Sequence, residues 1–244
     1  MDKKICAISD IHGDLIKLPE CDILCICGDI VPLWLQRSIE DSMYWLNGPF
    51  QDWLLKAPCE NVVMIWGNHD FIGEYFYQRN YSGSEQAGQL FDKDTNGKIH
   101  ILQDELVDIQ GIKFYGTPWC PALRGWAFYG DSKTLLEKYS NIPYDTDVLL
   151  THCPPKFGQQ GVVLQENWNL GRDFGSAELQ TVLEEKFKES MENSDYKKVH
   201  VLSGHIHSGN HYWENIGNVW YANVSIKDEN YESIYKPQIY TYYA

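Results

Sequence analysis

Five short clusters of aspartate, asparagine and histidine each follow an apolar run in this chain. They are Asp10-Ile11-His12, Gly28-Asp29, Gly67-Asn68-His69-Asp70, Thr151-His152 and Gly204-His205-Ile206-His207. In open α/β sheets, the loops beyond the carboxyl ends of the strands bind ligands. If the apolar runs are strands, these side chains meet at one edge, and their types are those that bind metal ions.

Two of the clusters place ligand-type side chains two residues apart, Asp10 with His12 and His205 with His207. On an extended segment, residues i and i+2 project to the same side, so each pair can reach one ion. Seven candidate ligands are too many for one ion that must also hold water, but they suit two ions that share a carboxylate. Two-metal centres, with ions roughly 3.5–4 Å apart, stabilise the attacking and leaving oxygens of phosphoryl displacement. The seven candidate ligands are Asp10, His12, Asp29, Asn68, His152, His205 and His207.

The ordered set of clusters resembles the motifs of the calcineurin-like metallophosphoesterase superfamily, over residues 10–207. Each motif alone is a weak signal, because Asp10-Ile11-His12 by itself would be an ordinary strand-end turn. Five motifs in the family's order are specific. Four further stretches resemble the branch of metallophosphoesterase-domain-containing phosphodiesterases: Gly116-Thr117-Pro118-Trp119, Gly125-Trp126-Ala127-Phe128, Thr151-His152-Cys153-Pro154-Pro155 and Tyr221-Ala222-Asn223-Val224-Ser225.

The resemblance implies an α/β fold, a four-layer αββα sandwich with two mixed β-sheets flanked by helices. It also implies two divalent metal ions, and leaves open whether they are Mn, Fe, Zn or Mg, since cellular supply contributes to that choice. The first ion would be held by Asp10, His12 and His207. The second would be held by Asn68, His152 and His205, and Asp29 would bridge the two.

The resemblance further implies hydrolysis by attack of a metal-bound hydroxide on phosphorus. His69 is adjacent to a ligand but belongs to no metal in the family pattern, so it is expected to be the general acid for the leaving group. Asp70 has two interpretations. It could accept a hydrogen bond from His69 and set its tautomer, or it could cap the helix that follows. Asp14, close by, could be a partner of the ligands from outside the metal centre, but a solvated turn is the expectation.

Departures from neighbouring families favour a diester substrate. Protein Ser/Thr phosphatases carry an arginine a few residues after the bridging aspartate, whereas Asp29 is followed here by Ile30-Val31-Pro32-Leu33. Without that arginine, a doubly charged monoester loses its natural partner, and a singly charged diester is the better substrate. Purple acid phosphatases place a tyrosine iron ligand at the position of Pro32, so a tyrosinate–iron chromophore is not expected.

A glycine- and proline-containing loop holds Trp119, Arg124 and Trp126. Aromatic rings beside a phosphate site can stack on a nucleobase, which is worth about 1–3 kcal/mol per base. The predicted substrates are therefore small nucleotide-type diesters, cyclic ones included. Plain core packing of these aromatic residues is the competing interpretation. The alternative functions are a phosphomonoesterase or nucleotide pyrophosphohydrolase and, from another class, a weakly active nucleotide-binding sensor.

Composition limits the partners. The 244 residues contain 20 Lys and Arg against 34 Asp and Glu, a formal charge of −14, which argues against binding long nucleic acid. No apolar run approaches the roughly 18 residues of a membrane span. The apolar run Ile5–Ile8 is too short for a signal sequence. Seven cysteines, an odd number, fit buried thiols in a cytoplasmic protein better than disulfides.

The elements expected to position the clusters are short buried strands alternating with helices. No repeat, linker or compositional break is present, so residues 1–244 are expected to form one domain. Strands are predicted at Lys4–Ser9, Asp22–Cys27, Asn61–Trp66, Val148–Leu150 and Val199–Leu202. A hairpin is predicted from Glu105–Ile109 and Ile112–Gly116, and further hairpins within Asn210–Tyr242, with one turn at Ile216-Gly217-Asn218. Helices are predicted at Leu33–Lys56, broken at Gly48-Pro49, at Phe71–Arg79 and, with a serine cap, at Ser176–Ser190, while Ser82–Gly97 reads as a polar loop.

Overall fold

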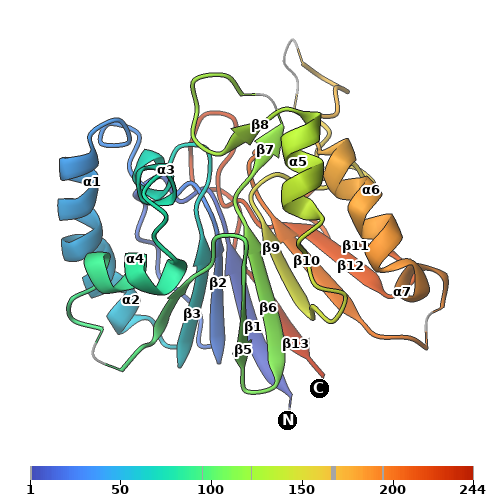
Figure 1. Cartoon of the computed structure of the whole chain (residues 1–244), viewed down its shortest axis with the longest axis horizontal. Helices are drawn as coiled ribbons and strands as arrows, with labels where there is room; N and C mark the ends of the chain where they lie inside the picture. Colours follow the sequence, from blue (N-terminus) through green and yellow to red (C-terminus); the bar gives the residue numbers. More distant parts are fainter. Residues whose placement is uncertain (1, 95, 122, 166–168, 194, 244) are drawn as a thin grey trace.

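Two mixed β-sheets pack face to face at the centre of the molecule, and helices cover the outer face of each sheet (Figure 1). The computed structural model describes residues 2–94, 96–121, 123–165, 169–193 and 195–243. This is the four-layer α/β sandwich that the resemblance implied. The helices between residues 39 and 90 lie on one side of the sandwich and those between residues 132 and 192 on the other (Figure 1).

Both sheets have a parallel centre; the first has an antiparallel strand at one edge only, and the second has antiparallel strands at both edges. The first sheet has the order β13 (Gln238–Tyr242), β1 (Lys3–Ile8), β2 (Ile23–Cys27), β3 (Asn61–Ile65), β4 (Ile99–Ile101). The second has the order β11 (Glu214–Ile216), β12 (Val219–Asn223), β10 (Val199–Ser203), β9 (Val148–Thr151), β6 (Ile112–Thr117), β5 (Glu105–Ile109). A separate two-stranded ladder joins β7 (Cys120–Pro121) and β8 (Tyr129–Gly130).

The helices lie in the segments between strands. Their bounds are α1 (Ile39–Trp45), α2 (Gln51–Lys56), α3 (Phe71–Tyr77), α4 (Gly83–Leu90), α5 (Ser132–Tyr139), α6 (Ala177–Lys186) and α7 (Lys188–Glu192). The predicted serine cap of α6 is confirmed, because Oγ of Ser176 accepts a hydrogen bond from the backbone N–H of Leu179 at 3.1 Å. The helix predicted there is divided at Phe187 into α6 and α7.

The predicted break at Gly48-Pro49 takes the form of a wider helical turn. A π-helical turn at Leu46–Phe50 contains Pro49 and joins α1 directly to α2. Proline lacks the N–H that an α-helix needs in its interior, and a single wider turn accommodates it without ending the helix.

Both faces of the central strands are buried, which explains their continuous apolar runs. Alternate residues point to opposite faces, so Ile5 and Ala7 of β1 lie in the layer between the sheets. Cys6 and Ile8 face the helices on the outside. All seven cysteines are free thiols, and six of them are buried, as the sequence indicated.

The prediction of a polar loop at 82–97 was wrong, because Gly83–Leu90 forms α4. Ser82 caps this helix at the backbone N–H of Glu85, and the carboxylate of Glu85 accepts from the backbone N–H of Ser82. Such a reciprocal capping box satisfies donors of the first turn that would otherwise lack partners. The helix is short and polar, so its apolar periodicity is weak, and the capping signal was the only local one.

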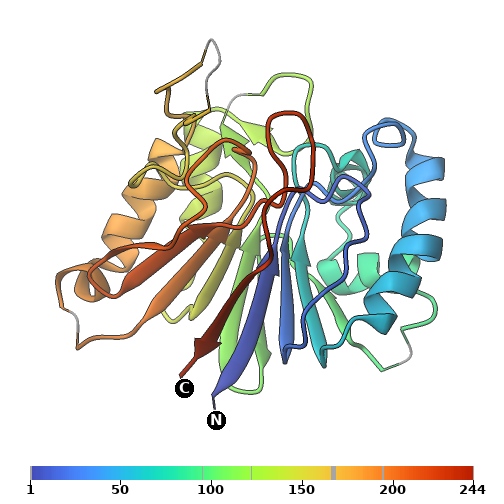
Figure 2. The same ribbon diagram turned by 180° about the vertical axis from the view of Figure 1, so that it is seen from behind.

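The hairpins predicted within residues 210–242 are present only in part. β11 and β12 form the hairpin expected around Gly217, with Ile216 paired to Val219. β13 instead leaves this sheet and pairs antiparallel with β1, so that Ile5 lies opposite Tyr240. Figure 2 shows this last strand in dark red beside the blue first strand. The segment between β12 and β13 must therefore cross from one sheet to the other.

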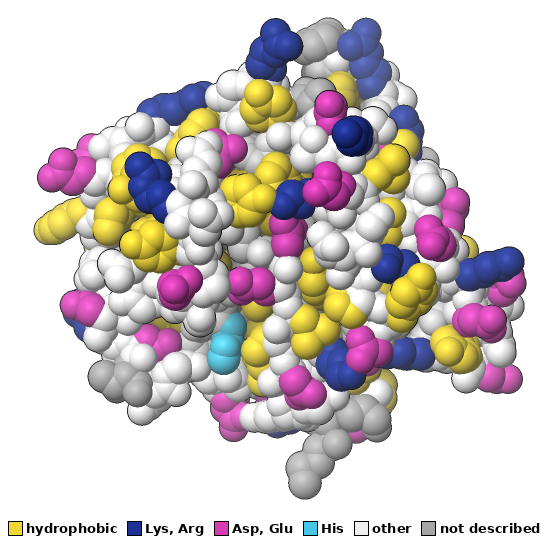
Figure 3. Space-filling model, in the orientation of Figure 1, with side chains coloured by type: hydrophobic (Ala, Val, Ile, Leu, Met, Phe, Trp, Pro, Cys, Tyr) yellow, Lys and Arg dark blue, Asp and Glu magenta, His cyan; other side chains and the backbone are white. Residues whose placement is uncertain are grey.

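Charged side chains of both signs are scattered over the face shown in Figure 3, with lysine and arginine among aspartate and glutamate. Within the described residues, no helix has the length and apolar character to cross a membrane.

Candidate metal centre

The structure brings the five clusters to one edge of the sandwich. Three clusters follow β1, β2 and β3 of the first sheet, and two follow β9 and β10 of the second. The carboxyl ends of these five parallel strands point to the same side of the molecule, the top in Figure 1. The shared edge predicted from the sequence is thus present, and it is built from both sheets.

Four of the candidate ligands have a left-handed backbone conformation that is rare for residues other than glycine. The φ angles are +56° at Asp10, +42° at His12, +53° at Asp29 and +68° at His205. Each such residue costs on the order of 1 kcal/mol or more, and such strain clusters at functional sites. Backbone hydrogen bonds hold the strained turns together, from Asp10 to Gly28 and from His12 to Asp29, both at 3.0 Å.

Asp10, His12 and His207 form the first group, with their ligand atoms within 4.8 Å of one another. Nε2 of His207 lies 3.4 Å from Oδ1 of Asp10. Nδ1 of His207 contacts the backbone carbonyl of Asp228 at 3.0 Å, so Nδ1 donates and Nε2 is left to face the carboxylate. The carboxylate of Asp10 also accepts from the backbone N–H of His205.

Asn68, His152 and His205 form the second group. Nε2 of His152 lies 2.9 Å from Oδ1 of Asn68, while Nδ1 contacts the carbonyl of Cys27 at 2.8 Å. The ring centroids of His152 and His205 are 5.1 Å apart. Cys120, which belongs to none of the sequence motifs, is also close, within 4.8 Å of ring nitrogens of both histidines.

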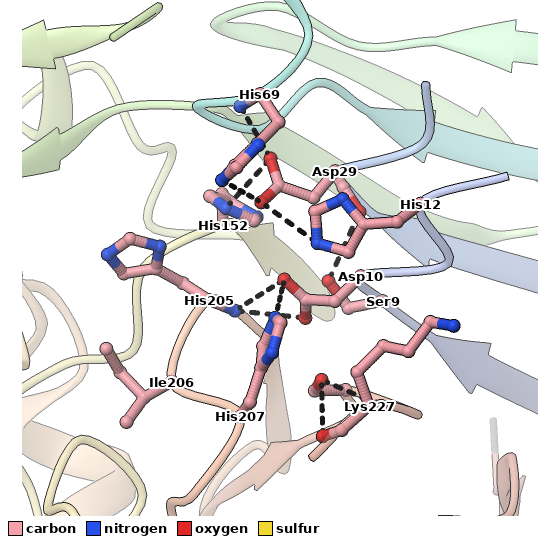
Figure 4. A network of polar contacts seen from close by, with 12 residues as sticks. Ser9, Asp10, His12, Asp29, His69, His152, His205, Ile206, His207 and Lys227 are labelled. Carbon is pink, nitrogen blue, oxygen red and sulfur yellow. Dashed lines mark hydrogen bonds and ion pairs between the residues drawn. The ribbon is translucent and has the colours of Figure 1, made fainter. Parts of the chain in front are cut away.

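Asp29 lies between the two groups (Figure 4). Its Oδ1 is 3.3 Å from Nε2 of His152 in the second group. Its Oδ2 is 3.7 Å from Nε2 of His12 in the first group and 3.9 Å from Nε2 of His69. One buried carboxylate therefore faces both groups, as a bridging ligand must.

Burial and mutual contact set the charges in this cluster. Burial acts to raise the pKa of Asp10 and Asp29, but the neighbouring histidines outweigh it and hold both pKa values below the usual range. Burial lowers the pKa of His12 to about 4 and that of His205 to about 3. Burial also acts to lower the pKa of His152, but Asp29 beside it raises that pKa to about 10. Ionised carboxylates and neutral imidazoles are the forms that bind cations, and a cation here would displace the proton of His152.

The side chain of His12 shows that the cluster fits a metal ion. Both of its ring nitrogens are buried, and neither has a hydrogen-bond partner in the described structure. A buried polar atom without a partner is destabilising and rare in proteins. A divalent ion beside Asp10, His12 and Asp29 would supply the missing partner.

His69 lies at the exposed side of the cluster. Its ring centroid is 4.9 Å from that of His12, and its Nδ1 lies 2.6 Å from Oε1 of Gln36. Burial lowers its pKa. Gln36 was not predicted from the sequence, because it is 33 residues from His69 in the chain and belongs to no motif.

The carboxylate of Asp70 makes neither of the contacts expected from the sequence. It accepts hydrogen bonds from the backbone N–H groups of Ile30 and Val31, both at 2.9 Å, and of Gly67 at 2.8 Å. Asp70 stands at the N-terminus of α3, but its side chain makes no capping bond there. The side chain therefore ties the loop after β2 to the loop after β3, and so fixes Asp29 relative to Asn68.

Replacing Asp70 with alanine should lower the free energy of unfolding by about 3 kcal/mol or more, because three buried donors lose their acceptor at about 1–3 kcal/mol each. Asp70→Asn keeps one oxygen and should lose less. Urea unfolding of both variants measures this, with the exposed Asp195→Ala as control. An alanine variant as stable as the wild type would contradict the role of this side chain.

The three residues predicted to bind substrate, Trp119, Arg124 and Trp126, lie in different surroundings. Trp119 is buried, its Nε1 donates to Asp104 at 3.0 Å, and its ring packs on Phe128, so it belongs to the core. Arg124 is exposed and does not line the cavity at the metal centre. Trp126 does line that cavity, with its ring centroid 4.3 Å from that of His69.

The side chain of Arg37 contacts Trp126 and the residue before it. The guanidinium of Arg37 lies 4.9 Å from the ring centroid of Trp126 and donates to the backbone carbonyl of Gly125 at 3.0 Å. The same guanidinium lies over the ring of Phe71. Trp126 is therefore the one residue of the predicted substrate set that the structure places at the centre.

A cavity of about 290 Å³ opens onto the cluster. Its lining includes Asp29, Asn68, His69, His205 and His207, together with Trp126, Glu229 and Tyr231. A larger cavity of about 480 Å³ lies between α4 and strands β4 and β5, but none of the candidate residues lines it. The smaller cavity is therefore the one of these two that candidate ligands line.

The fold and this cluster are those of metal-dependent phosphoesterases. Residues 3–209 match the family described as calcineurin-like phosphoesterase, and the chain belongs to that family. The family binds divalent metal ions and acts on small phosphoesters, so the protein is a phosphoester hydrolase by class.

Among its relatives is metallophosphoesterase domain-containing protein 1 of Homo sapiens, 29% identical over 94% of this chain and 68% of that protein. A UPF0046 protein of Caenorhabditis elegans is 30% identical over 81% of this chain and 50% of that protein. A solved structure of a sulfate thiohydrolase SoxB from Thermus thermophilus in complex with glycerol is 12% identical. It covers 83% of this chain and 33% of the other, with a TM-score of 0.36. A likeness at that score supports no conclusion about this chain.

Proposed function

We propose that this protein is a dinuclear metal-dependent phosphodiesterase that hydrolyses small nucleotide-type diesters, cyclic ones included. The observation that carries the proposal is the position of Asp29 between two groups of ligand-type side chains, with His69 and an open cavity beside it. Two divalent ions at such a centre supply Lewis acidity and make a nucleophile available from water near neutral pH.

The residues have separate roles in this proposal. Asp10, His12 and His207 hold one ion, Asn68, His152 and His205 hold the other, and Asp29 contacts both. His69 binds no metal. With Nδ1 held by Gln36, its Nε2 is the atom that gives a proton to the leaving oxygen.

Charge in the cavity supports a diester over a monoester. The described lining contains the acids Asp29 and Glu229 but neither lysine nor arginine. Asp29 is followed by the buried apolar residues Ile30 and Val31. The guanidinium of Arg37, farther along the same loop, lies over the rings of Phe71 and Trp126 and does not line the cavity. No Lys or Arg of the described lining is therefore there to pair with the second negative charge of a monoester, whereas a diester carries only one.

Replacing Trp126 with alanine should weaken inhibition by a nucleoside monophosphate about tenfold or more, since stacking of a base on an aromatic ring is worth about 1–3 kcal/mol. Inhibition by ribose 5-phosphate, which has no base to stack, should change little. The inhibition constants of both compounds measure the difference. Tyr44→Ala, which removes a ring that is 81% exposed on α1, is the control. Equal loss for both inhibitors would mean that no base stacks on Trp126.

The direct test is removal of metal with a chelator, reloading with Mn²⁺, Fe²⁺, Zn²⁺ or Mg²⁺, and assay against cyclic and linear nucleotide diesters, monoesters and pyrophosphates. We expect activity to vanish on chelation, to return with metal, and to be highest on diesters. Faster hydrolysis of monoesters or pyrophosphates would identify the alternative enzyme classes. Tight nucleotide binding with negligible metal-stimulated turnover would identify a sensor.

The proposal also covers the domain organisation and the cellular location of the enzyme. We propose that residues 1–244 act as one domain, which the pairing of the C-terminal strand β13 with the N-terminal strand β1 supports. A cytoplasmic location is also proposed, supported by seven free thiols.

A further inference from the structure

The segment that joins β12 to β13 crosses directly above the metal centre. Its first part follows β1, because the backbone N–H of Ile226 donates to the carbonyl of Ser9, the residue before Asp10, at 3.1 Å. Its second part returns antiparallel to the first, and an isolated β-bridge joins the backbones of Lys227 and Ser233. Figure 2 shows this loop in dark red, above the carboxyl ends of the strands. We refer to residues 227–233 as the crossover loop.

The crossover loop is held in one conformation by bonds of its own. The carboxylate of Asp228 accepts from the backbone N–H groups of Asn230 at 2.9 Å and Glu232 at 2.8 Å. The backbone N–H of Tyr231 donates to the carbonyl of Asp228 at 3.0 Å, and Tyr231 has a left-handed φ of +62°. The loop is therefore a closed turn, with Tyr231 placed at its tip.

A second set of contacts fastens the crossover loop to the metal centre. Asp14, two residues past His12, forms an ion pair with Lys227 and accepts from Oγ of Ser233 at 2.7 Å. Asp14 lies in a solvent-exposed turn, as expected, with its side chain 52% exposed, but the sequence did not predict these two partners. Lys227 is only 4% exposed, so this pair is shielded from water on the lysine side. The carbonyl of Asp228 contacts His207 as well.

These contacts place the ring of Tyr231 against the first group of ligands. Its centroid is 5.1 Å from that of His12 and 5.1 Å from that of His207, and both pairs are edge-to-face. Tyr231 is 39% exposed and lines the same cavity as Trp126. An aromatic ring that is held rigidly but left partly open to a cavity can bind a flat or apolar group at little entropic cost.

Trp126 and Tyr231 contact different parts of the cluster. Trp126 packs on His69, which under the proposed function protonates the leaving group. Tyr231 packs on His12 and His207, on the side of the first ion. A phosphodiester has two organic arms, one that leaves and one that stays on phosphorus. A monoester has only one.

We infer that Tyr231 contacts the ester arm that remains on phosphorus, and that the crossover loop thereby selects diesters whose retained arm is a ring. This inference rests on the proposed function and adds to it a residue that determines specificity. Asp14, through Lys227 and Ser233, is a positioning residue for Tyr231. The other wall, formed by Trp126, is left to the departing arm.

Two synthetic diesters with the same leaving group test this inference. Phenyl p-nitrophenyl phosphate and methyl p-nitrophenyl phosphate both release p-nitrophenolate, and they differ only in the retained arm. In the metal-loaded wild type we expect kcat/KM to be higher for the phenyl ester. Tyr231→Ala should reduce the ratio of the two kcat/KM values about tenfold, chiefly through KM, as expected for the loss of one stacking contact. Tyr231→Phe should keep the ratio.

Two further variants separate contact with substrate from a structural role. Ser233→Ala loosens the attachment to Asp14 and should shift the ratio in the same direction but less. Ile234→Ala, a neighbouring side chain that is 57% exposed, should leave the ratio unchanged. Metal content, measured by elemental analysis, should stay at the wild-type value in all of these variants.

The outcomes distinguish this inference from the proposed function. If Tyr231→Ala lowers both rates equally, or lowers the metal content, the ring supports the metal centre and does not contact the retained arm. If the wild type hydrolyses the phenyl and methyl esters equally well, the crossover loop does not select a ring. If the wild type cleaves neither diester but cleaves monoesters, the proposed function itself is wrong.

Discussion

Replacing Asp29 with asparagine should remove both metal ions and reduce hydrolysis by on the order of a thousandfold, comparable to the loss of a major charge-stabilising group elsewhere. We expect this loss because the carboxylate of Asp29 lies between the two groups of ligands. Asp29 is 2% exposed and faces His152 on one side and His12 on the other. Asparagine keeps the shape but loses the charge that offsets two dications.

The measurement is metal stoichiometry after loading, together with the rate on a nucleotide diester. Asp147→Asn is a matched control, because Asp147 is also a buried aspartate but lies at the opposite end of β9, with Tyr242 and Lys197 as partners. It should keep both ions. Two ions bound in the Asp29 variant would contradict a bridging position.

Replacing His69 with asparagine should reduce turnover about 10²–10⁴-fold for diesters with alkoxide leaving groups, the usual range for loss of a general acid. The loss should be much smaller for p-nitrophenolate, which leaves without a proton. Metal content should be unchanged, because His69 is not among the seven candidate ligands. Rates on a series of diesters with leaving groups of increasing pKa measure this dependence.

Gln36→Leu provides an intermediate variant in the same series. It removes the partner of Nδ1, which lies 2.6 Å away, but leaves the His69 ring in place. We expect a loss with the same leaving-group dependence and a smaller size. An equal loss on all leaving groups in the His69 variant would rule out proton donation and leave a role in charge stabilisation.

The chain's local patterns predicted the strands and the location of the site well. Apolar runs of five or six residues are strands because both of their faces are buried, and each of the five clusters begins where such a run ends. Parallel strands share one carboxyl edge, so the residues that come directly after each strand are neighbours in space. The Ser176 cap was predictable because it too is local, since donor and acceptor are three residues apart.

Local patterns failed where the partner is distant in sequence. The residues of β13 alternate in burial, as in other edge strands, and this pattern does not predict that β13 pairs with β1. Asp70 looks like a helix cap or a partner of its neighbour His69, yet its three donors come from two different loops. Trp119 and Trp126 lie seven positions apart in one loop, and only packing separates a core residue from one that lines the cavity.

By itself, the sequence determined which side chains gather at one edge and what chemistry their types permit, because side-chain chemistry and strand polarity are local properties. Only the tertiary structure decided how those side chains are oriented and what surrounds them. Gln36 beside His69, Asp14 beside Lys227 and Tyr231 above His12 join segments separated by 33 to 219 positions. Such contacts are made by the packing of the whole chain, so no short stretch of sequence contains them.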